Sequence, residues 1–151
     1  MPTQLQPGDK APAFTGINQD GIKVSLSGLK GKKVVLYFYP EDDTPTCTVQ
    51  ACNLRDNYGA LTKAGYTVIG VSPNSIADHQ KFREKFNLPF SLLADPEHKI
   101  INAYGVWGEK NLYGRKYMGL HRTTFVIDEK ALIEKVFLRP KSKAHAEEIL
   151  K

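Results

Sequence analysis

The sequence predicts an α/β fold in which a central mixed β-sheet carries helices on both faces. Two apolar runs, 33–39 and 66–71, have the length of buried strands, and helical patterns over 45–64 and 76–86 follow them. Strands that alternate with helices pair in parallel, whereas two adjacent strands near the C-terminus favour an antiparallel hairpin. These observations together predict a sheet of mixed direction.

The elements are expected in the order β-β-β-α-β-α-β-α-β-β-α. The first two strands flank the turn sequence Asn18-Gln19-Asp20-Gly21, which predicts an N-terminal hairpin. Ser75 is placed to cap one helix, and Gly65 ends the helix before it. The glycine-rich, aromatic segment 105–119 is expected to be a long loop. The predicted strands are 13–17, 24–26, 33–39, 66–71, 90–93, 122–127 and 132–138, and the predicted helices are 45–64, 76–86, 97–104 and 142–151.

Length and composition favour a single soluble domain over residues 1–151. The chain is 41% hydrophobic and 25% charged, which is ordinary for a globular protein. Its net charge of +5 comes from scattered Lys and Arg, so no nucleic-acid partner is expected. No apolar run reaches the roughly 20 residues of a membrane span, and residues 1–8 lack the pattern of a signal peptide. Two cysteines are too few for a disulfide scaffold, so a cytoplasmic location is expected.

A cysteine falls in the first turn of the helix that follows the strand 33–39. Thr44 is a good N-cap residue, Pro45 suits the first helical position, and Cys47 is the third helical residue. Unpaired N–H groups and the positive end of the helix dipole favour the thiolate there, and the thiolate is the nucleophilic form of cysteine. The alternative is a small buried hydrophobe. Active sites of open α/β sheets lie at the carboxyl ends of strands, which is the position of Cys47.

The motif around this cysteine resembles the signature of peroxiredoxins. That signature is P-x-x-x-T-x-x-C, formed here by Pro40, Thr44 and Cys47. The continuation to Cys52 is similar to the Q-type subgroup, also called bacterioferritin-comigratory proteins. The resemblance covers essentially the whole chain and implies a thioredoxin-like fold. Three segments carry it, namely 40–52, 104–110 and 119–128.

The resemblance implies a thiol-dependent peroxidase that reduces hydrogen peroxide and organic hydroperoxides in antioxidant defence. Cys47 corresponds to the peroxidatic cysteine and Cys52 to the resolving cysteine. Thr44 would hydrogen-bond the peroxide and the thiolate, Pro40 would shield the sulfur from water, and Arg122 would lie beside the sulfur. Thioredoxin is the implied reductant, and the subgroup favours a monomer. No metal, flavin or nucleotide motif is present, so no cofactor is expected and the chemistry must come from the cysteines.

Each implied role has a chemical reason. Attack by a thiolate on one peroxide oxygen makes the other oxygen a developing anion, which a fixed cation and aligned donors can stabilise. Arg122 is permanently charged and carries several donors in a rigid fork, so it can serve sulfur and oxygen together. A sulfenic acid formed at Cys47 would then condense with a nearby thiol.

The spacing of the two cysteines predicts a conformational change. Helical positions five apart have Cα atoms roughly 8–9 Å apart on divergent faces, whereas a disulfide requires less than about 7 Å. Cys47 and Cys52 cannot bond within an intact helix, so we expect its first turns to unwind during turnover. Two positions depart from the subgroup, since Thr46 replaces its usual glycine and Gln50 stands where many relatives have Glu.

Other functions remain open from sequence. A general disulfide oxidoreductase would use C-x-x-C, whereas this chain has C-x-x-x-x-C. A non-enzymatic redox sensor or holdase would share the first oxidation step but would not cycle. The two cysteines have no nearby partner for zinc. Among neighbouring residues, Asp42 and Asp43 are expected to be solvated, and Trp107 is expected to pack in the long loop over the site.

Overall fold

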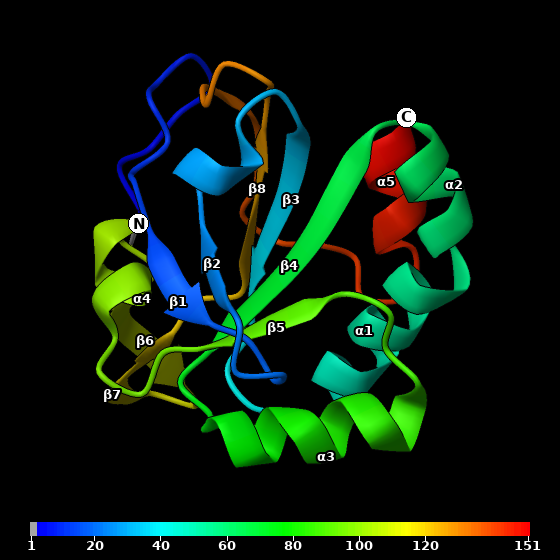
Figure 1. Cartoon of the computed structure of the whole chain (residues 1–151). Helices are drawn as coiled ribbons and strands as arrows, with labels where there is room; N and C mark the ends of the chain where they lie inside the picture. Colours follow the sequence, from blue (N-terminus) through cyan, green and yellow to red (C-terminus); the bar gives the residue numbers. More distant parts are fainter. Residues whose placement is uncertain (1–2) are drawn as a thin grey trace.

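The computed structural model describes residues 3–151, in which a seven-stranded sheet forms the centre of the molecule (Figure 1). The strand order is β2-β1-β5-β4-β3-β8-β9. The pairs β3–β4 and β4–β5 are parallel, and the other neighbours are antiparallel, so the predicted mixed sheet is confirmed. The strands of this sheet are β1 Thr15–Ile17, β2 Lys23–Ser25, β3 Lys33–Phe38, β4 Tyr66–Ser72, β5 Ser91–Ala94, β8 Thr123–Ile127 and β9 Ile133–Phe137.

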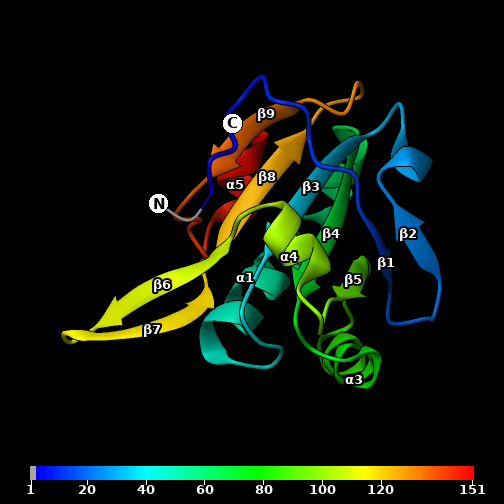
Figure 2. The ribbon, with the colours of Figure 1, turned by 90° about the vertical axis from the view of Figure 1, so that its left-hand side faces the viewer.

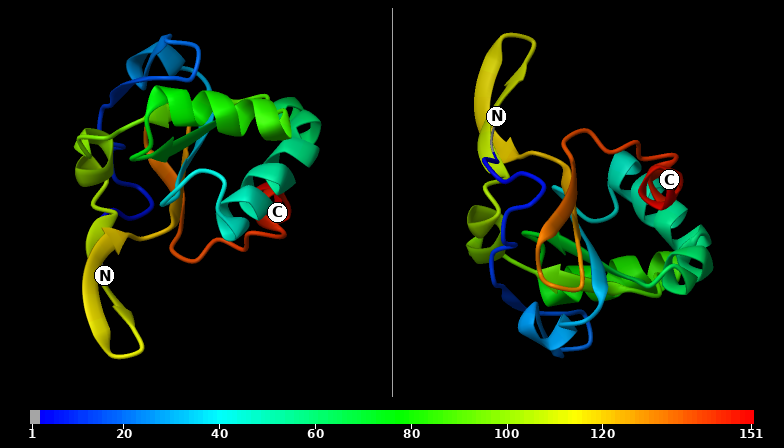
Figure 3. Two further views of the ribbon diagram at one scale, coloured as in Figure 1. Left: turned by 90° about the horizontal axis from the view of Figure 1, so that it is seen from below. Right: turned by 90° about the horizontal axis from the view of Figure 1, so that it is seen from above.

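Helices cover both faces of the sheet, as predicted. On one face lie α1, α2, α3 and α5, and on the other lies α4 (Figure 3). The helices are α1 Pro45–Asp56, α2 Tyr58–Lys63, α3 Ile76–Phe86, α4 Lys99–Ala103 and α5 His145–Leu150, and a 3-10 turn η1 spans Ser27–Leu29. None of the helices within residues 3–151 is long and apolar enough to cross a membrane.

Local capping explains where α3 lies. It begins after Ser75, whose hydroxyl accepts a hydrogen bond from the backbone N–H of Asp78 at 3.1 Å. It ends at Asn87, which adopts the left-handed conformation that commonly follows a helix. The predicted range 76–86 and its Ser75 cap are therefore confirmed.

The predicted single helix over 45–64 is wrong, because the chain breaks it at Asn57. The side-chain amide of Asn57 donates to the Asn53 carbonyl at 2.9 Å, and its backbone leaves helical geometry at φ −108°, ψ 13°. Asparagine side chains compete in this way with helical hydrogen bonding. Two helices, α1 and α2, result.

The predicted loop over 105–119 is also wrong, because a separate hairpin forms there. Its strands are β6 Trp107–Leu112 and β7 Arg115–Leu120, and they extend away from the body of the molecule (Figure 2). Tyr113 and Gly114 form its turn, with φ values of +52° and +82°. Tight hairpins require such left-handed pairs, usually Asn-Gly or Asp-Gly, so Tyr-Gly gives a weak signal in the sequence.

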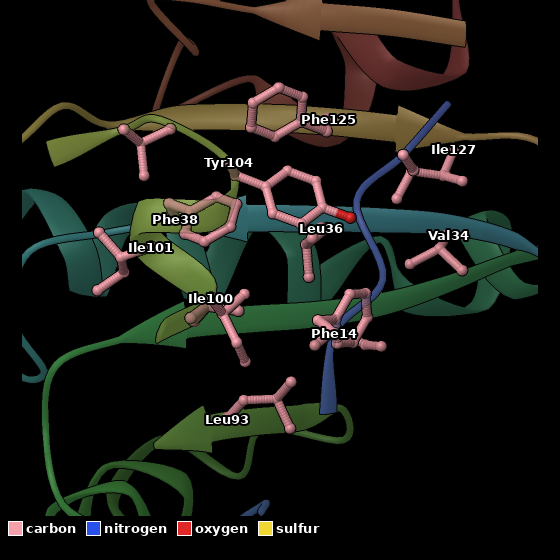
Figure 4. Packing of buried hydrophobic residues seen from close by; sticks show 14 of the residues in the cluster. Phe14, Val34, Leu36, Phe38, Leu93, Ile100, Ile101, Tyr104, Phe125 and Ile127 are labelled. Atoms are coloured by element: carbon pink, nitrogen blue, oxygen red, sulfur yellow. The ribbon is translucent and has the colours of Figure 1, made fainter. Parts of the chain in front are cut away.

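Alternate residues of β3 contribute to two separate cores. Leu36 and Phe38 face α4, where an aromatic group of Phe38, Tyr104 and Phe125 fills the space (Figure 4). Tyr37 faces the opposite side, in a core that also contains Cys47. Trp107 packs against His98 and the core under α4, so it does not lie on the Cys47 side as expected.

Candidate active site

The candidate site forms where central strand β3 passes into helix α1. The connecting loop, residues 40–44, begins at half-buried Pro40 and ends at Thr44, the N-cap position of α1. Pro45 takes the first helical position, as its missing N–H and fixed φ favour. Cys47 follows in the first turn with 1% of its surface exposed.

Thr44 occupies the predicted cap position, but its hydroxyl does not cap the helix. Its backbone is extended at φ −91°, ψ 157°, and the hydroxyl donates to the Glu41 carbonyl at 2.9 Å. The backbone carbonyl of Thr44 accepts from the Thr48 N–H at 2.8 Å. The hydroxyl is therefore turned toward the loop, and the first N–H groups of α1 are left without a side-chain acceptor from Thr44.

Arg122 lies beside the Cys47 sulfur. Its Nη2 donates to Cys47 Sγ at 3.1 Å, and its Nη1 donates to Gln50 Oε1 at 2.9 Å. Arg122 immediately precedes β8, which pairs with β3 so that Thr123 is opposite Phe38. This pairing delivers an arginine distant in sequence to the carboxyl end of β3. The guanidinium fork contacts the cysteine and the residue one helical turn after it.

Two buried polar atoms near this site have no hydrogen-bond partner among the described residues. They are the amide Nε2 of Gln50 and the hydroxyl of Tyr37. Burial is the main cause that raises the pKa of Tyr37 well above its ordinary value, and the charges of Asp42 and Cys47 add to it. The Tyr37 ring fits only because Gly70 is opposite, since a Cβ there would lie 2.8 Å from Tyr37 Cζ.

The second cysteine lies further along the same unbroken helix. Both Cys47 and Cys52 are free thiols, and α1 continues through both of them. Cys52 is half-buried, and Thr46, which replaces the subgroup's usual glycine, is exposed.

Helix α5 packs against the part of α1 that follows Cys52. Asn53 Oδ1 accepts from the backbone N–H of Ala146 at 2.8 Å, and its Nδ2 donates to the Lys143 carbonyl at 3.0 Å. Asn57 Nδ2 also contacts Glu147 Oε1 at 3.1 Å. Side-chain hydrogen bonds thus tie the end of α1 to α5 and to the residues just before it.

Asp42, expected to be solvated, is instead buried, with 5% of its side chain exposed. Its carboxylate bonds the Tyr39 hydroxyl at 2.5 Å and His79 Nδ1 at 2.6 Å. Asp43 is the exposed acid of this pair, at 47% exposure, and it contacts Lys85 at 2.9 Å. The expectation failed for Asp42 because its partners come from Tyr39, just after β3, and from α3, which the local sequence does not reveal.

Sequence reasoning did not identify Tyr37, His79 or Asn53. His79 left one usable signal, since it shares the inward face of α3 with Phe82, three residues on. A histidine at a core position of an amphipathic helix requires buried hydrogen-bond partners. Its two partners lie in other elements, so their identity was beyond the sequence.

Within residues 3–151, no group of three or more His, Cys, Asp or Glu side chains is arranged to hold a metal. The structure brings together the Cys47 sulfur and the Arg122 guanidinium, and Thr44 lies three residues before the cysteine with its hydroxyl bonded to the Glu41 carbonyl. A thiol next to a fixed cation, in the first turn of a helix, is the environment in which cysteine acts as a nucleophile.

Comparison with known proteins identifies the family. The AhpC/TSA family model matches residues 7–136. A putative peroxiredoxin Bcp of Coxiella burnetii is 48% identical over 146 residues, 97% of each chain. Peroxiredoxin Bcp of Escherichia coli is 45% identical, over 97% of this chain and 94% of that protein. The solved structure of Xanthomonas campestris peroxiredoxin Q is similar with a TM-score of 0.87 at 28% identity, covering 99% of this chain and 95% of that one. The chain therefore belongs to the AhpC/TSA family and, within it, to the Bcp or Q-type peroxiredoxins.

Proposed function

We propose that this chain reduces hydrogen peroxide and organic hydroperoxides with Cys47 as the nucleophile, and that thioredoxin returns it to the reduced state. The observation that carries the proposal is the 3.1 Å contact between Arg122 Nη2 and Cys47 Sγ in the first turn of α1. A guanidinium favours the thiolate over the thiol, and it stays charged at every physiological pH.

The first step is an in-line displacement. The Cys47 thiolate attacks one oxygen of the peroxide, and the O–O bond breaks. The electron pair goes to the other oxygen, which takes up a proton and leaves as water or an alcohol. Cys47 becomes a sulfenic acid. Arg122 stabilises the charge on the leaving oxygen because its donors are fixed before the reaction begins.

Thr44 is suited to orient the peroxide. A carbonyl oxygen only accepts hydrogen bonds, so the Thr44 hydroxyl is the donor in its hydrogen bond with the Glu41 carbonyl. The lone pairs of its oxygen are then left to accept the O–H of a bound peroxide. Pro40, half-buried at the start of the same loop, limits the access of water to the sulfur. An apolar depression beside this turn suits the organic part of a hydroperoxide, and its lining is Pro45, Thr46, Val49, Ser142 and Lys143.

The second step joins the two cysteines. The Cys52 thiolate attacks the sulfenic sulfur, the S–O bond breaks, and hydroxide leaves as water after protonation. This requires α1 to unwind, because a continuous helix holds the two positions too far apart. We expect the unwinding to stop before Asn53, whose amide oxygen accepts from Ala146 in α5 and whose amide nitrogen donates to the Lys143 carbonyl just before α5.

Peroxide-dependent oxidation of NADPH, coupled through thioredoxin and thioredoxin reductase, tests the function. We expect sustained turnover in the parent protein and none in Cys47→Ser. Loss of turnover in Cys52→Ser, with a single oxidation retained, would support Cys52 as the resolving thiol. One oxidation without turnover in the parent protein would contradict a peroxidase recycled by thioredoxin and favour a redox sensor or a different reductant.

The unwinding has its own test in hydrogen exchange. In the disulfide form, the amides of residues 48–56 should exchange far faster than in the reduced form, because their helical acceptors are the carbonyls of residues 44–52. The N–H of Asn57, which donates to the Asn53 carbonyl at 3.2 Å, should keep its protection. An oxidised protein with a 47–52 disulfide and unchanged protection over 48–52 would contradict the unwinding. We also propose that the protein acts in the cytoplasm as a monomer, which the elution volume of the purified chain checks for its oligomeric state.

A further inference from the structure

A buried hydrogen-bond network lies behind the loop that precedes Cys47. Asp42 is at its centre, with Oδ1 accepting from the Tyr39 hydroxyl at 2.5 Å and Oδ2 contacting His79 Nδ1 at 2.6 Å. Burial raises the pKa of Tyr39 well above its ordinary value, so its hydroxyl keeps the proton that it donates. The other ring nitrogen of His79 lies 3.0 Å from the Leu93 carbonyl oxygen.

The partners of His79 fix how its protons are placed. The Leu93 carbonyl can only accept, so His79 Nε2 carries a proton. The contact between Nδ1 and Asp42 Oδ2 then holds one further proton, on the imidazole or on the carboxyl. In either arrangement the histidine bridges β5 and the loop. His79 belongs to α3 and its side chain is fully buried, so the bridge is shielded from water.

The backbone of the same loop residue extends the network to Thr44. The peptide between Glu41 and Asp42 uses both of its polar groups. Its N–H donates to Asn74 Oδ1 at 2.9 Å, and its C=O accepts from the Thr44 hydroxyl at 2.9 Å. Asn74 Oδ1 also accepts from the Ser72 hydroxyl at 2.8 Å. This one peptide plane therefore decides where the Thr44 oxygen points.

We propose that His79 is a positioning residue, which acts through Asp42 to hold the Glu41–Asp42 peptide and thereby the hydroxyl of Thr44 at the peroxide site. This inference rests on the proposed peroxidase function. His79 itself touches neither sulfur nor peroxide. Its contribution is the orientation of a group that does.

Under the proposed mechanism α1 unwinds in each cycle, so it matters which elements hold the loop that precedes Cys47. The network draws its anchors from Tyr39 just after β3, from β5, from α3 and from the β4–α3 connection, and none of them from α1. The loop and its Thr44 hydroxyl therefore stay in place when residues 45–52 leave the helix. After reduction, α1 rebuilds its first turn onto a loop that is already in its reactive conformation.

The two ring nitrogens of His79 can be tested separately. An asparagine amide nitrogen reaches the place of Nδ1, whereas a glutamine amide nitrogen reaches that of Nε2. His79→Asn thus keeps the bond to Asp42, and His79→Gln keeps only the bond to Leu93. Asp42→Asn is a second conservative variant, because its amide can accept from Tyr39 and donate to Nδ1 of a neutral His79. Asp42→Ala removes both bonds.

The measurement compares two reactions of Cys47 in full-length protein carrying Cys52→Ser, so that Cys47 is the single thiol. The rate constants with hydrogen peroxide and with iodoacetamide are determined by mass spectrometry after quenching. Iodoacetamide alkylation reports the thiolate and its exposure, and it does not use the Thr44 hydroxyl. The ratio of the two rate constants therefore isolates the orientation of the peroxide.

We expect His79→Gln and Asp42→Ala to lower the peroxide rate constant at least about tenfold, because a displacement of about 1 Å can cost on the order of 100-fold. Their iodoacetamide rate constants should change far less. His79→Asn and Asp42→Asn should retain most of the peroxide rate constant. Asp43→Asn, an equal change of charge in the exposed neighbour, is the matched control and should behave as the parent.

Two results would overturn the inference alone: a peroxide rate constant for His79→Gln equal to that of a fast parent, or an equal fall of both rate constants. If the parent reacts with peroxide no faster than a free cysteine, the proposed function fails and the inference fails with it. Should Asp42→Ala not fold, the pair His79→Gln and His79→Asn still decides the question, with near-ultraviolet circular dichroism as the check on folding.

Discussion

On the face of the sheet that α4 covers, aromatic rings fill the core, and the hydroxyl of Tyr104 finds a partner in the Pro12 carbonyl at 2.7 Å. On the face that α1 covers, the core includes a free thiol and the buried polar atoms of Tyr37 and Gln50 that lack partners. Apolar packing of the first kind stabilises a fold without regard to function. The second kind costs stability, because unpaired polar groups lose their contacts with water.

The candidate site lies on the face of the sheet that carries these unpaired polar groups. Helix α1, whose unwinding is proposed above, lies on the face with the unpaired groups. No residue of α1 belongs to the core under α4, so the proposed unwinding leaves that packing unchanged. Substitutions that affect one face alone can therefore separate stability from reactivity.

The largest expected effect is on the face under α4. Phe125 is fully buried between Phe38 and Tyr104, so Phe125→Ala should lower the free energy of unfolding by about 3–5 kcal/mol. The rate constant of Cys47 with peroxide should be unchanged in the protein that remains folded. Urea titration and stopped-flow oxidation measure the two quantities. Tyr117→Ala, on the exposed hairpin, is the control and should stay within about 0.5 kcal/mol of the parent.

On the other face, Arg122→Met should have the converse result. Removal of one preorganised donor costs on the order of 100- to 1,000-fold in rate, so peroxide oxidation of Cys47 should slow by that factor while the fold is retained. Arg122→Lys keeps the charge but cannot serve both Cys47 and Gln50, so it should restore only part of the rate. Arg115→Met, at an exposed arginine of the hairpin, is the control. Parent-like oxidation of Arg122→Met would contradict the role of this cation.

The sequence predicts features that depend on neighbouring residues better than features that depend on residues distant in sequence. Ile76–Phe86 with its Ser75 cap was predictable because helix signals are local, and so was the place of Cys47 after a buried strand. The hairpin of β6 and β7 was missed because Tyr-Gly is an unusual turn pair. Burial of Asp42 was missed because it depends on His79, and no local pattern links the two. The positions of helices and of Cys47 along the chain were therefore predictable, but hydrogen bonds between residues distant in sequence were not.

The roles assigned to Cys47, Cys52, Thr44, Arg122 and Pro40, and the extent of a single domain over 1–151, stay predictions. Proximity of Arg122 to Cys47 was expected from motif resemblance alone, and β3–β8 pairing supplies its physical cause. The Thr44 hydroxyl shows the opposite case. Its residue type suggested a helix cap, but the loop offers it the Glu41 carbonyl instead.

A smaller effect is expected where β4 makes room for Tyr37. Gly70→Ala would place a Cβ 2.8 Å from Tyr37 Cζ and 3.0 Å from a Leu92 methyl, so it should cost about 1–3 kcal/mol by overpacking. Gly59→Ala is the matched control, because its Cβ would meet nothing within 4 Å and it lies within α2. There the same change should stabilise by about 0.4–1 kcal/mol. Equal effects of the two substitutions, measured by thermal unfolding, would contradict the close fit at Gly70.

The smallest effect concerns the pH dependence of stability through His145. This buried side chain joins α5 to the sheet, with Nε2 at 2.8 Å from the Thr124 hydroxyl and Nδ1 at 2.6 Å from Glu148 Oε1. Burial lowers the pKa of His145 below its ordinary value of 6.5, although the hydrogen bond and charge of Glu148 oppose this shift. As pH falls through that value, the unfolded chain takes up the proton before the folded one. The His145 contribution to stability is therefore complete above it and is lost as the pH decreases further.

Two substitutions test this sign by urea unfolding between about pH 7.5 and pH 5.5. His145→Gln removes the titrating group, so the decrease in the free energy of unfolding with acid should become smaller than in the parent. Glu148→Gln removes the main charge that opposes the shift and leaves that of Glu147, so the pKa of His145 should fall further and the decrease should become steeper. A slope that is the same in all three proteins would mean that the imidazole is equally protonated in the folded and unfolded chains. In that case acid would weaken the attachment of α5 through the carboxylates alone. His145 would then not couple pH to the stability of α5, the helix that Asn53 contacts.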